Sequence, residues 1–131
     1  MGHIWVRAMI RNSFTDRSIP DKALVNTGAI DTVIPRRIAE ELQPPITGRS
    51  TVPTTKGPVE PDEYTGVIGI TSRRRAAPML VSKDVGFPLI GVAILKQLSL
   101  EVNPATGRLR GSVAFLHLRR IRVMRLGAHL R

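Results

Sequence analysis

The chain has 131 residues, of which 42% are hydrophobic and 23% charged, and it contains no cysteine. This length predicts one domain with a core of its own, and the missing cysteines exclude a disulfide scaffold and any thiolate metal site. The net charge is +10, but it is concentrated after Glu101, because only 13 of the 20 basic side chains, against all 10 acidic ones, lie in residues 1–101.

Membrane and export signals are missing from the sequence. No apolar run approaches the roughly 18 residues that a membrane-spanning helix needs. Residues 1–14 carry charged side chains inside their apolar stretch, which a signal peptide does not tolerate. We therefore expect a soluble, cytoplasmic protein without a transmembrane segment.

The first third of the chain predicts two strands and a turn. Apolar and polar side chains alternate from Ile4 to Arg11, and this period of two predicts a half-buried strand. Residues 12–21 are rich in turn-forming residues and predict a hairpin loop. Residues 22–26 predict a short second strand, which ends in a turn at Asn26.

A short helix is expected next. Ile34, Ile38 and Leu42 recur at the spacing of one helical face. Pro35 suits a first helical turn, and the pair of prolines after Gln43 ends the helix after about two turns.

The middle of the chain predicts strands and loops. Residues 47–66 are rich in Gly, Pro and Thr, which is typical of strands joined by a long exposed loop. Residues 67–72 and 77–82 predict two strands on either side of a basic, solvated turn at residues 73–75.

The last predicted elements follow an apolar stretch at residues 87–102. A strand is expected to end at Ile90 and Gly91, a second short helix to cover residues 92–98, and a hairpin to cover residues 100–111. The sum is a mainly-β domain with one or two short helices over residues 1–110, followed by a basic extension over residues 111–131.

Two patches about 60 residues apart carry a family resemblance. The first is "ALVNTGA", an apolar strand that runs into the turn at Asn26; the second is "FPLIGVAILKQLSLEV", which leads into the closing hairpin "LEVNPATGRL". Together they resemble the retropepsin-like aspartic proteases, including small microbial members, from Ile4 to Leu109. In that family a strand delivers Asp-Thr-Gly-Ala. The resemblance implies a retropepsin-like acid-protease barrel.

The chemistry of such a site needs two carboxylates. When they lie about 3 Å apart they share one proton, so that one activates water and the other protonates the scissile carbonyl oxygen. One motif in 131 residues gives only half of this site, so the resemblance implies a two-fold homodimer that cleaves peptide or protein substrates. No metal or cofactor is implied.

The resemblance also assigns roles around the turn. Thr27 would hydrogen-bond across the dimer axis, and Gly28 would let the substrate backbone approach closely, since it has no Cβ. Ala29 would line the cleft, and Asp31 falls near a position where the family often anchors substrate or subunit.

A flap is the next implied feature. Residues 54–66 stand where the family has the hairpin that closes over substrate, with Lys56 and Gly57 as candidate substrate contacts. Gly57 and Gly66 would then be tip or hinge residues. Composition alone favours an ordinary exposed loop, and only the position in the family order supports the flap.

Position 26 departs from the family, because Asn26 stands where the family has its catalytic aspartate. An amide neither gives up nor takes a proton near neutral pH, so the chain as written is expected to be inactive. Three interpretations stay open: an introduced replacement that silences an active protease, a natural non-catalytic relative that binds peptides in the cleft, or a turn unrelated to catalysis.

The C-terminal extension has no assigned role. Residues 113–118 could form a strand, and the following arginines are interleaved with apolar residues, a pattern that can contact nucleic acid or an anionic membrane. A solvated or frayed end explains the same residues. The three histidines, His3, His117 and His129, show no metal-ligand spacing and are expected at the surface.

Overall fold

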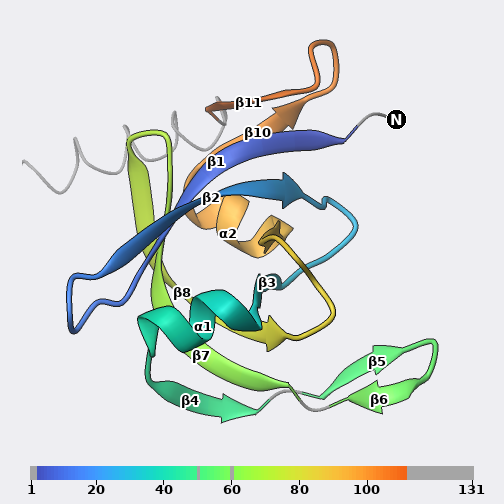
Figure 1. Cartoon of the computed structure of the whole chain (residues 1–131). Coiled ribbons are helices and arrows are strands. Elements are labelled where there is room, and N and C mark those ends of the chain that lie inside the picture. The colour runs from blue at the N-terminus through green and yellow to red at the C-terminus, as the bar shows by residue number, and fades with distance from the viewer. Residues whose placement is uncertain (1–2, 50, 60, 112–131) are drawn as a thin grey trace, which may run out of the picture.

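The structure is a computed structural model that describes residues 3–49, 51–59 and 61–111, which form eleven strands and two helices (Figure 1). The strands are β1 Ile4–Arg11, β2 Ser18–Val25, β3 Thr32–Pro35, β4 Ile46–Arg49, β5 Val52–Thr54, β6 Gly57–Val59, β7 Asp62–Ile70, β8 Arg73–Ser82, β9 Leu89–Ile90, β10 Leu100–Asn103 and β11 Arg108–Gly111. The helices are α1 Arg36–Leu42 and α2 Val92–Gln97.

The main sheet closes on itself. Its order is β1-β2-β9-β3-β8-β7-β4, and β1 also pairs with β7, so that the strands from β1 to β7 form a small barrel. Two hairpins, β5–β6 and β10–β11, lie outside this sheet as separate two-stranded units. Figure 1 shows β5–β6 projecting from the barrel at one end and β10–β11 lying beyond β1.

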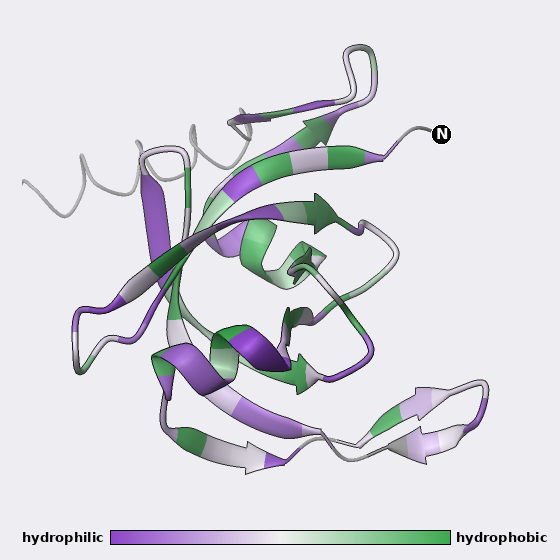
Figure 2. Ribbon diagram, in the orientation of Figure 1, coloured by the Kyte–Doolittle hydropathy of each residue, from purple (hydrophilic) through white to green (hydrophobic). Residues whose placement is uncertain are grey.

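The alternation along β1 is confirmed. Ala8 and Ile10 are buried, whereas Trp5 and Met9 on the opposite face are 40% and 41% exposed. Figure 2 shows the corresponding change between apolar and polar residues along the strand. The inward side chains of β1 are therefore held by burial, and a shift of one residue in register would expose all of them.

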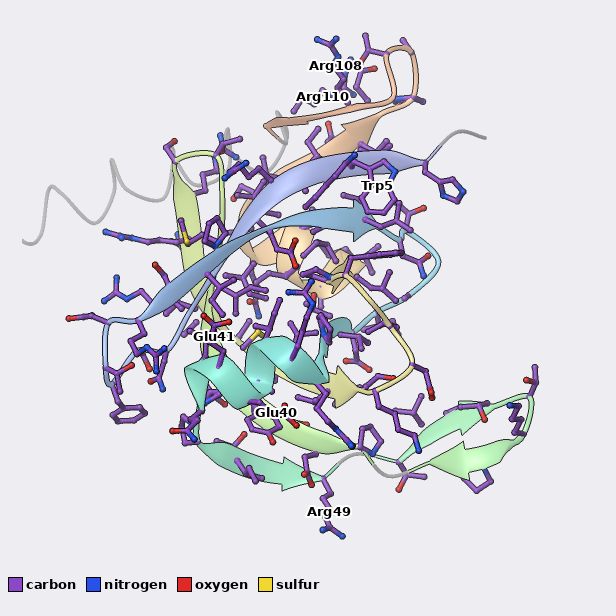
Figure 3. All side chains as sticks on the ribbon, in the orientation of Figure 1. Trp5, Glu40, Glu41, Arg49, Arg108 and Arg110 are labelled. Carbon is purple, nitrogen blue, oxygen red and sulfur yellow. The ribbon has the colours of Figure 1, made fainter. Side chains whose placement is uncertain are left out.

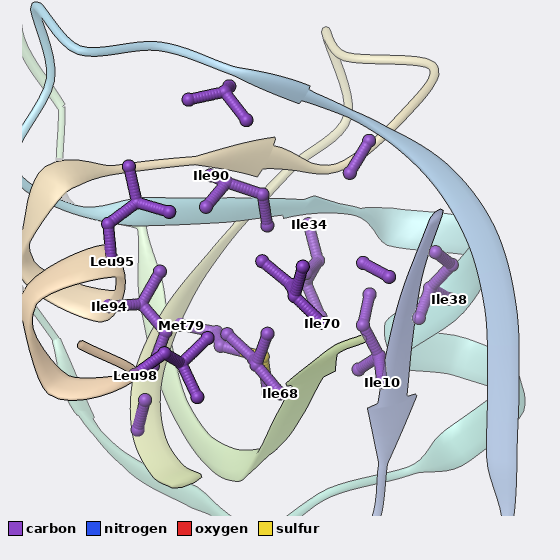
Figure 4. Close-up of a cluster of buried hydrophobic side chains, with 14 of the residues drawn as sticks. Ile10, Ile34, Ile38, Ile68, Ile70, Met79, Ile90, Ile94, Leu95 and Leu98 are labelled. Carbon is purple, nitrogen blue, oxygen red and sulfur yellow. The ribbon is translucent and has the colours of Figure 1, made fainter. Parts of the chain in front are cut away.

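The core is aliphatic and is covered by both helices (Figure 4). Ile38 and Leu42 from α1 and Ile94 and Leu95 from α2 are buried in one cluster with inward side chains of the barrel strands. The helices are short, six and seven residues, so their stability comes from this packing and not from helix propensity.

Most predicted elements are confirmed, but some bounds differ. β2 begins at Ser18, inside the loop predicted for residues 12–21, and β7 begins at Asp62, before the strand predicted for residues 67–72. The strand at residues 4–11, the helix within residues 92–98 and the hairpin at residues 100–111 are present. Pro35, however, ends β3 and precedes α1 with an extended ψ of 149°. Thr32 to Pro35 pair with β8 in parallel, and this long-range pairing outweighs the helical spacing that begins at Ile34.

The expectation of a basic turn at residues 73–75 is wrong, because β8 begins at Arg73. The turn lies between the end of β7 and Arg73, where Thr71 adopts a left-handed φ of 58°. Arg73 donates to the carbonyl oxygens of Leu98 and Ser99, and so ties the start of β8 to the end of α2.

Neither helix of the described part is long and apolar enough to cross a membrane. The predictions of a strand at residues 113–118 and of a basic cluster after it lie outside the described residues.

Candidate active site

The candidate site is a tight turn at the end of β2. The backbone N–H of Asn26 donates to the carbonyl oxygen of Ile90 at 2.9 Å, which continues the parallel pairing of β2 with β9. The Asn26 carbonyl then accepts from the N–H of Ala29 at 3.2 Å, and its side-chain Oδ1 accepts from the N–H of Gly28 at 3.0 Å. The backbone bond from Ala29 closes the turn, and the bond from Gly28 to Oδ1 holds the polar end of the Asn26 side chain inside it.

Gly28 belongs to this turn for a steric reason. A Cβ at this position would lie 3.3 Å from Oδ1 of Asn26, closer than most real Cβ contacts. A side chain would therefore push against the amide that the Gly28 N–H binds. The predicted neighbours Asn26, Thr27 and Gly28 are all exposed, whereas Ala29 is half-buried.

The loop after the turn is fixed by the second apolar patch. The carbonyl oxygens of Ala29 and Ile30 accept from the N–H groups of Val92 and Ala93 at 2.9 and 3.1 Å, which satisfies two free donors at the start of α2. The carboxylate of Asp31 is exposed, and within the described part of the chain it makes no hydrogen bond or ion pair.

Thr32 and Gly91 form a buried link that the sequence analysis did not single out. The Gly91 N–H donates to Oγ1 of Thr32 at 3.1 Å. A Cβ on Gly91 would lie 2.3 Å from the Ile30 carbonyl oxygen and 2.4 Å from that of Asp31, so only glycine fits. In the sequence, an apolar strand followed by a glycine occurs in both patches and points to Gly91. This pattern does not show which side chain lies next to that glycine.

An apolar groove opens beside Thr27. It has a volume of about 420 Å³ and lies between the turn, α2 and β10, with Val92, Leu95, Leu100 and Val102 among the residues that line it. Lys96 and Glu101 provide its charged side chains. An apolar groove directly beside an exposed polar turn is a surface on which another chain could pack.

The β5–β6 hairpin forms one wall of a larger cleft. The cleft has a volume of about 770 Å³, and Lys56 lines it together with the apolar residues Val33, Leu80 and Leu89. Asn26, Thr27, Gly28, Ala29 and Asp31 are not among the described residues that line it. In one chain, therefore, the turn and the hairpin are not brought into a single pocket.

The hairpin tip is organised by Thr54 and Gly57. Oγ1 of Thr54 donates to the Gly57 carbonyl at 2.6 Å and accepts from the Lys56 N–H at 3.2 Å, and Gly57 has a φ of 107° that favours glycine. Gly66 is not a tip or hinge residue, because it lies buried inside β7, where a Cβ would meet Met79 at 2.5 Å.

The side chain at position 26 is an amide, which does not ionise near neutral pH. Among the described residues, no cluster of three or more His, Asp or Glu side chains could hold a metal ion. The geometry offers an amide-bearing turn, one nearby exposed carboxylate at Asp31, and a separate cleft under a hairpin that apolar and charged side chains line together.

A closed barrel, with β9 inserted between β2 and β3 next to the Asn26 turn and a projecting hairpin, defines the retropepsin-like fold. Two solved structures share it with this chain. The solution structure of simian foamy virus (mac) protease matches with a TM-score of 0.54 and 22% identity, covering 72% of this chain and 94% of that one. EIAV protease in complex with the inhibitor HBY-793 matches with a TM-score of 0.60 and 21% identity, covering 74% and 88%.

No family model and no curated protein sequence matches the chain significantly. At this level of identity the likeness to the two viral proteases establishes the fold, and function has to be argued from the site itself.

Proposed function

We propose that this domain is the half-site scaffold of an aspartic endopeptidase, which forms a homodimer around two copies of the Asn26 turn. The chain with Asn26 binds extended peptides but does not hydrolyse them. The observation that carries the proposal is the Asn26 turn: one exposed copy, held by the Ile90, Gly28 and Ala29 hydrogen bonds, at the end of a barrel strand.

The proposed inactivity follows from the chemistry of the amide. Activation of water needs a group that takes up its proton, and an asparagine side chain cannot do so near neutral pH. Two chains bring two amides to the axis and no carboxylate at that position. An aspartate at position 26 would keep the shape of the turn, since a carboxylate oxygen could accept the Gly28 N–H in place of the amide Oδ1.

The homodimer is supported by the apolar groove beside Thr27. A second copy that covers it would remove Val92, Leu95, Leu100 and Val102 from water and bring Thr27 close to the axis. In such a dimer the Thr27 hydroxyl would hydrogen-bond to the partner turn. The residues Ala8 to Arg11 of β1 already pair with β7, so they have no free strand edge to offer a partner subunit.

The proposed substrate is an extended peptide with apolar side chains. The cleft under the β5–β6 hairpin is walled by Val33, Leu80 and Leu89, and the exposed Lys56 at the hairpin could contact the peptide backbone. The hairpin would act as the flap, with Gly57 at its tip. Ala29 and Asp31 would contact the peptide where it passes the turn.

The experiment that tests the proposal replaces Asn26 by aspartate. Asn26→Asp should digest denatured protein at about pH 4 to 6, where two neighbouring carboxylates share one proton, and a pepstatin-like inhibitor should block the digestion. The matched control is Asn103→Asp, because Oδ1 of Asn103 accepts the Ala105 N–H at 3.0 Å in a similar turn, and Asn103 lines neither the groove beside Thr27 nor the cleft under the hairpin. Inactivity of a folded Asn26→Asp protein across this range would reject the endopeptidase scaffold.

A non-catalytic peptide-binding module on the same fold is the second candidate. It is favoured by the amide at position 26, which leaves the turn without an ionisable group while its Oδ1 still accepts the Gly28 N–H. An inactive Asn26→Asp variant, together with unchanged peptide binding in the cleft, would support this function over the first.

A further inference from the structure

In the part of the chain that the structure describes, the first half of the barrel strand β1 is paired on one side only. The strand pairs with β2 over its whole length, but with β7 only from Ala8 to Arg11. Within the described residues, the segment from Ile4 to Arg7 therefore has an open edge on the β7 side. Unpaired strand edges bind other extended chains unless they are covered.

The hydrogen-bond pattern shows which groups face this open edge. The Asn12 N–H donates to the Arg17 carbonyl, and in an antiparallel pair such bonds alternate along the strand. Even-numbered residues of β1 therefore bond to β2. The backbone N–H and C=O groups of Trp5 and Arg7 point to the open side, where an added strand would pair with them.

A groove runs along the open edge. It has a volume of about 750 Å³ and lies between the first half of β1, the end of β7 and the β10–β11 turn. Its ionisable lining residues among those described are His3, Arg7 and Arg108, and none is acidic. Arg110 on the same hairpin is neutralised by Glu101, whereas Arg7 and Arg108 form no ion pair in the described part of the chain.

The wall of the groove also carries an ordered aromatic side chain. Trp5 packs against Phe87 with ring centroids 4.8 Å apart, and Nζ of Lys22 lies 5.0 Å from the centroid of its ring. Trp5 remains 40% exposed in this arrangement. Figure 3 shows Trp5 on β1 and Arg108 and Arg110 on the neighbouring hairpin.

We propose that this groove binds an acidic, extended peptide segment of another protein, which adds as a strand to the Trp5–Arg7 edge of β1. The free N–H and C=O groups would bind the peptide backbone, while Arg7 and Arg108 select carboxylate side chains. This surface is separate from the Asn26 turn and from the cleft under the β5–β6 hairpin.

Charge and backbone geometry select this occupant over two others. Residues 112–131 contain five arginines and no acidic residue, so Arg7 and Arg108 would repel that segment. A nucleic acid would satisfy the charges but has no peptide groups to pair with the strand edge. An acidic peptide satisfies both features.

The test measures binding to the full chain, with an eight-residue peptide that alternates glutamate and valine as the probe. Trp5 is the only tryptophan in the chain, so its fluorescence should change on binding. The amide protons of Trp5 and Arg7 should gain protection from hydrogen exchange, whereas that of Val6 should change little because it already faces β2. N-methylation of those alternate peptide residues whose N–H groups face the β1 edge should abolish binding.

Two variants separate the site from general charge effects. Arg7→Glu should weaken binding by about tenfold or more, since it places a like charge against the peptide. Arg17→Glu lowers the net charge equally but lies in the β1–β2 loop, and it should leave the affinity within about twofold. Equal effects of the two variants would overturn the proposal. Equal binding of a lysine–valine peptide, or of a short single-stranded DNA without protection of the Trp5 amide, would also overturn it.

Discussion

Oγ1 of Thr32 accepts a hydrogen bond from the backbone N–H of Gly91 at 3.1 Å, in a buried position where both partners are screened from water. The bond joins the first residue of β3 to the residue that precedes α2. It therefore holds the segment that follows the Asn26 turn to the second sequence patch, which contains Gly91.

Loss of this bond should destabilise the fold. Thr32→Val keeps the shape of the side chain but leaves the buried Gly91 N–H without an acceptor, so the free energy of unfolding should fall by about 1–3 kcal/mol. Thr32→Ser keeps the hydroxyl and should cost about 1 kcal/mol or less. Urea unfolding of both variants measures the difference, and equal stability of Thr32→Val and the unchanged chain would contradict it.

A methyl group at position 91 should have a larger effect. In Gly91→Ala the new Cβ would lie 2.3 Å from a backbone oxygen, so the loop after Asn26 has to move. We expect the free energy of unfolding to fall by about 3 kcal/mol, which is the upper end of the range for an overpacked site. Gly86→Ala is the matched control, because no atom lies within 4 Å of its Cβ position. A Gly91→Ala protein as stable as the Gly86→Ala protein would refute the assigned contact.

The proposed dimer should depend little on pH as long as position 26 is asparagine. Two amides can donate to and accept from each other at any pH. In Asn26→Asp, two carboxylates share a proton at about pH 5 and the dimer holds, but at about pH 8 both ionise, repel each other and weaken it. Sedimentation at micromolar concentration checks this, and a monomer at both pH values in the unchanged chain would defeat the dimer.

The apolar groove beside Thr27 predicts where this dimer forms. Val92→Glu places a charge on the proposed interface and should weaken dimerisation by about tenfold or more, because the carboxylate would lose its water. Ile46→Glu makes the same kind of change at a 60% exposed residue that does not line the groove, and it should have no effect. Circular dichroism should show that both variants are folded.

The arginines of the C-terminal extension predict salt-dependent binding to polyanions. If all five arginines of residues 112–131 contact phosphates, affinity for duplex DNA should fall by up to about 500-fold between 50 and 200 mM salt, through counterion release. Replacing the five by glutamine should remove most of this binding and flatten the salt dependence.

The control for the extension removes five positive charges from the body instead. The exposed side chains to replace are Arg17, Arg36, Arg74, Arg75 and Lys83. An equal loss of DNA affinity in the two proteins would show that net charge, and not the extension, is responsible.

Local patterns were enough to predict several elements. The alternation along β1, the spacing of Ile38 and Leu42 in α1, and the turn residues between β10 and β11 each act within a few residues of one another. The sequence also placed a tight turn at Asn26 and a strand end at Ile90, because an apolar run that stops at small residues is itself a local signal.

The tertiary structure alone decided how these pieces meet. The parallel pairing that makes a strand of Thr32–Pro35, the extension of β8 back to Arg73, and the insertion of β9 between β2 and β3 depend on contacts between residues distant in the chain. Such contacts override local propensity, because burying a strand on both sides stabilises it more than its own sequence does. The open edge of β1 arises in the same way, since it exists only where β7 ends.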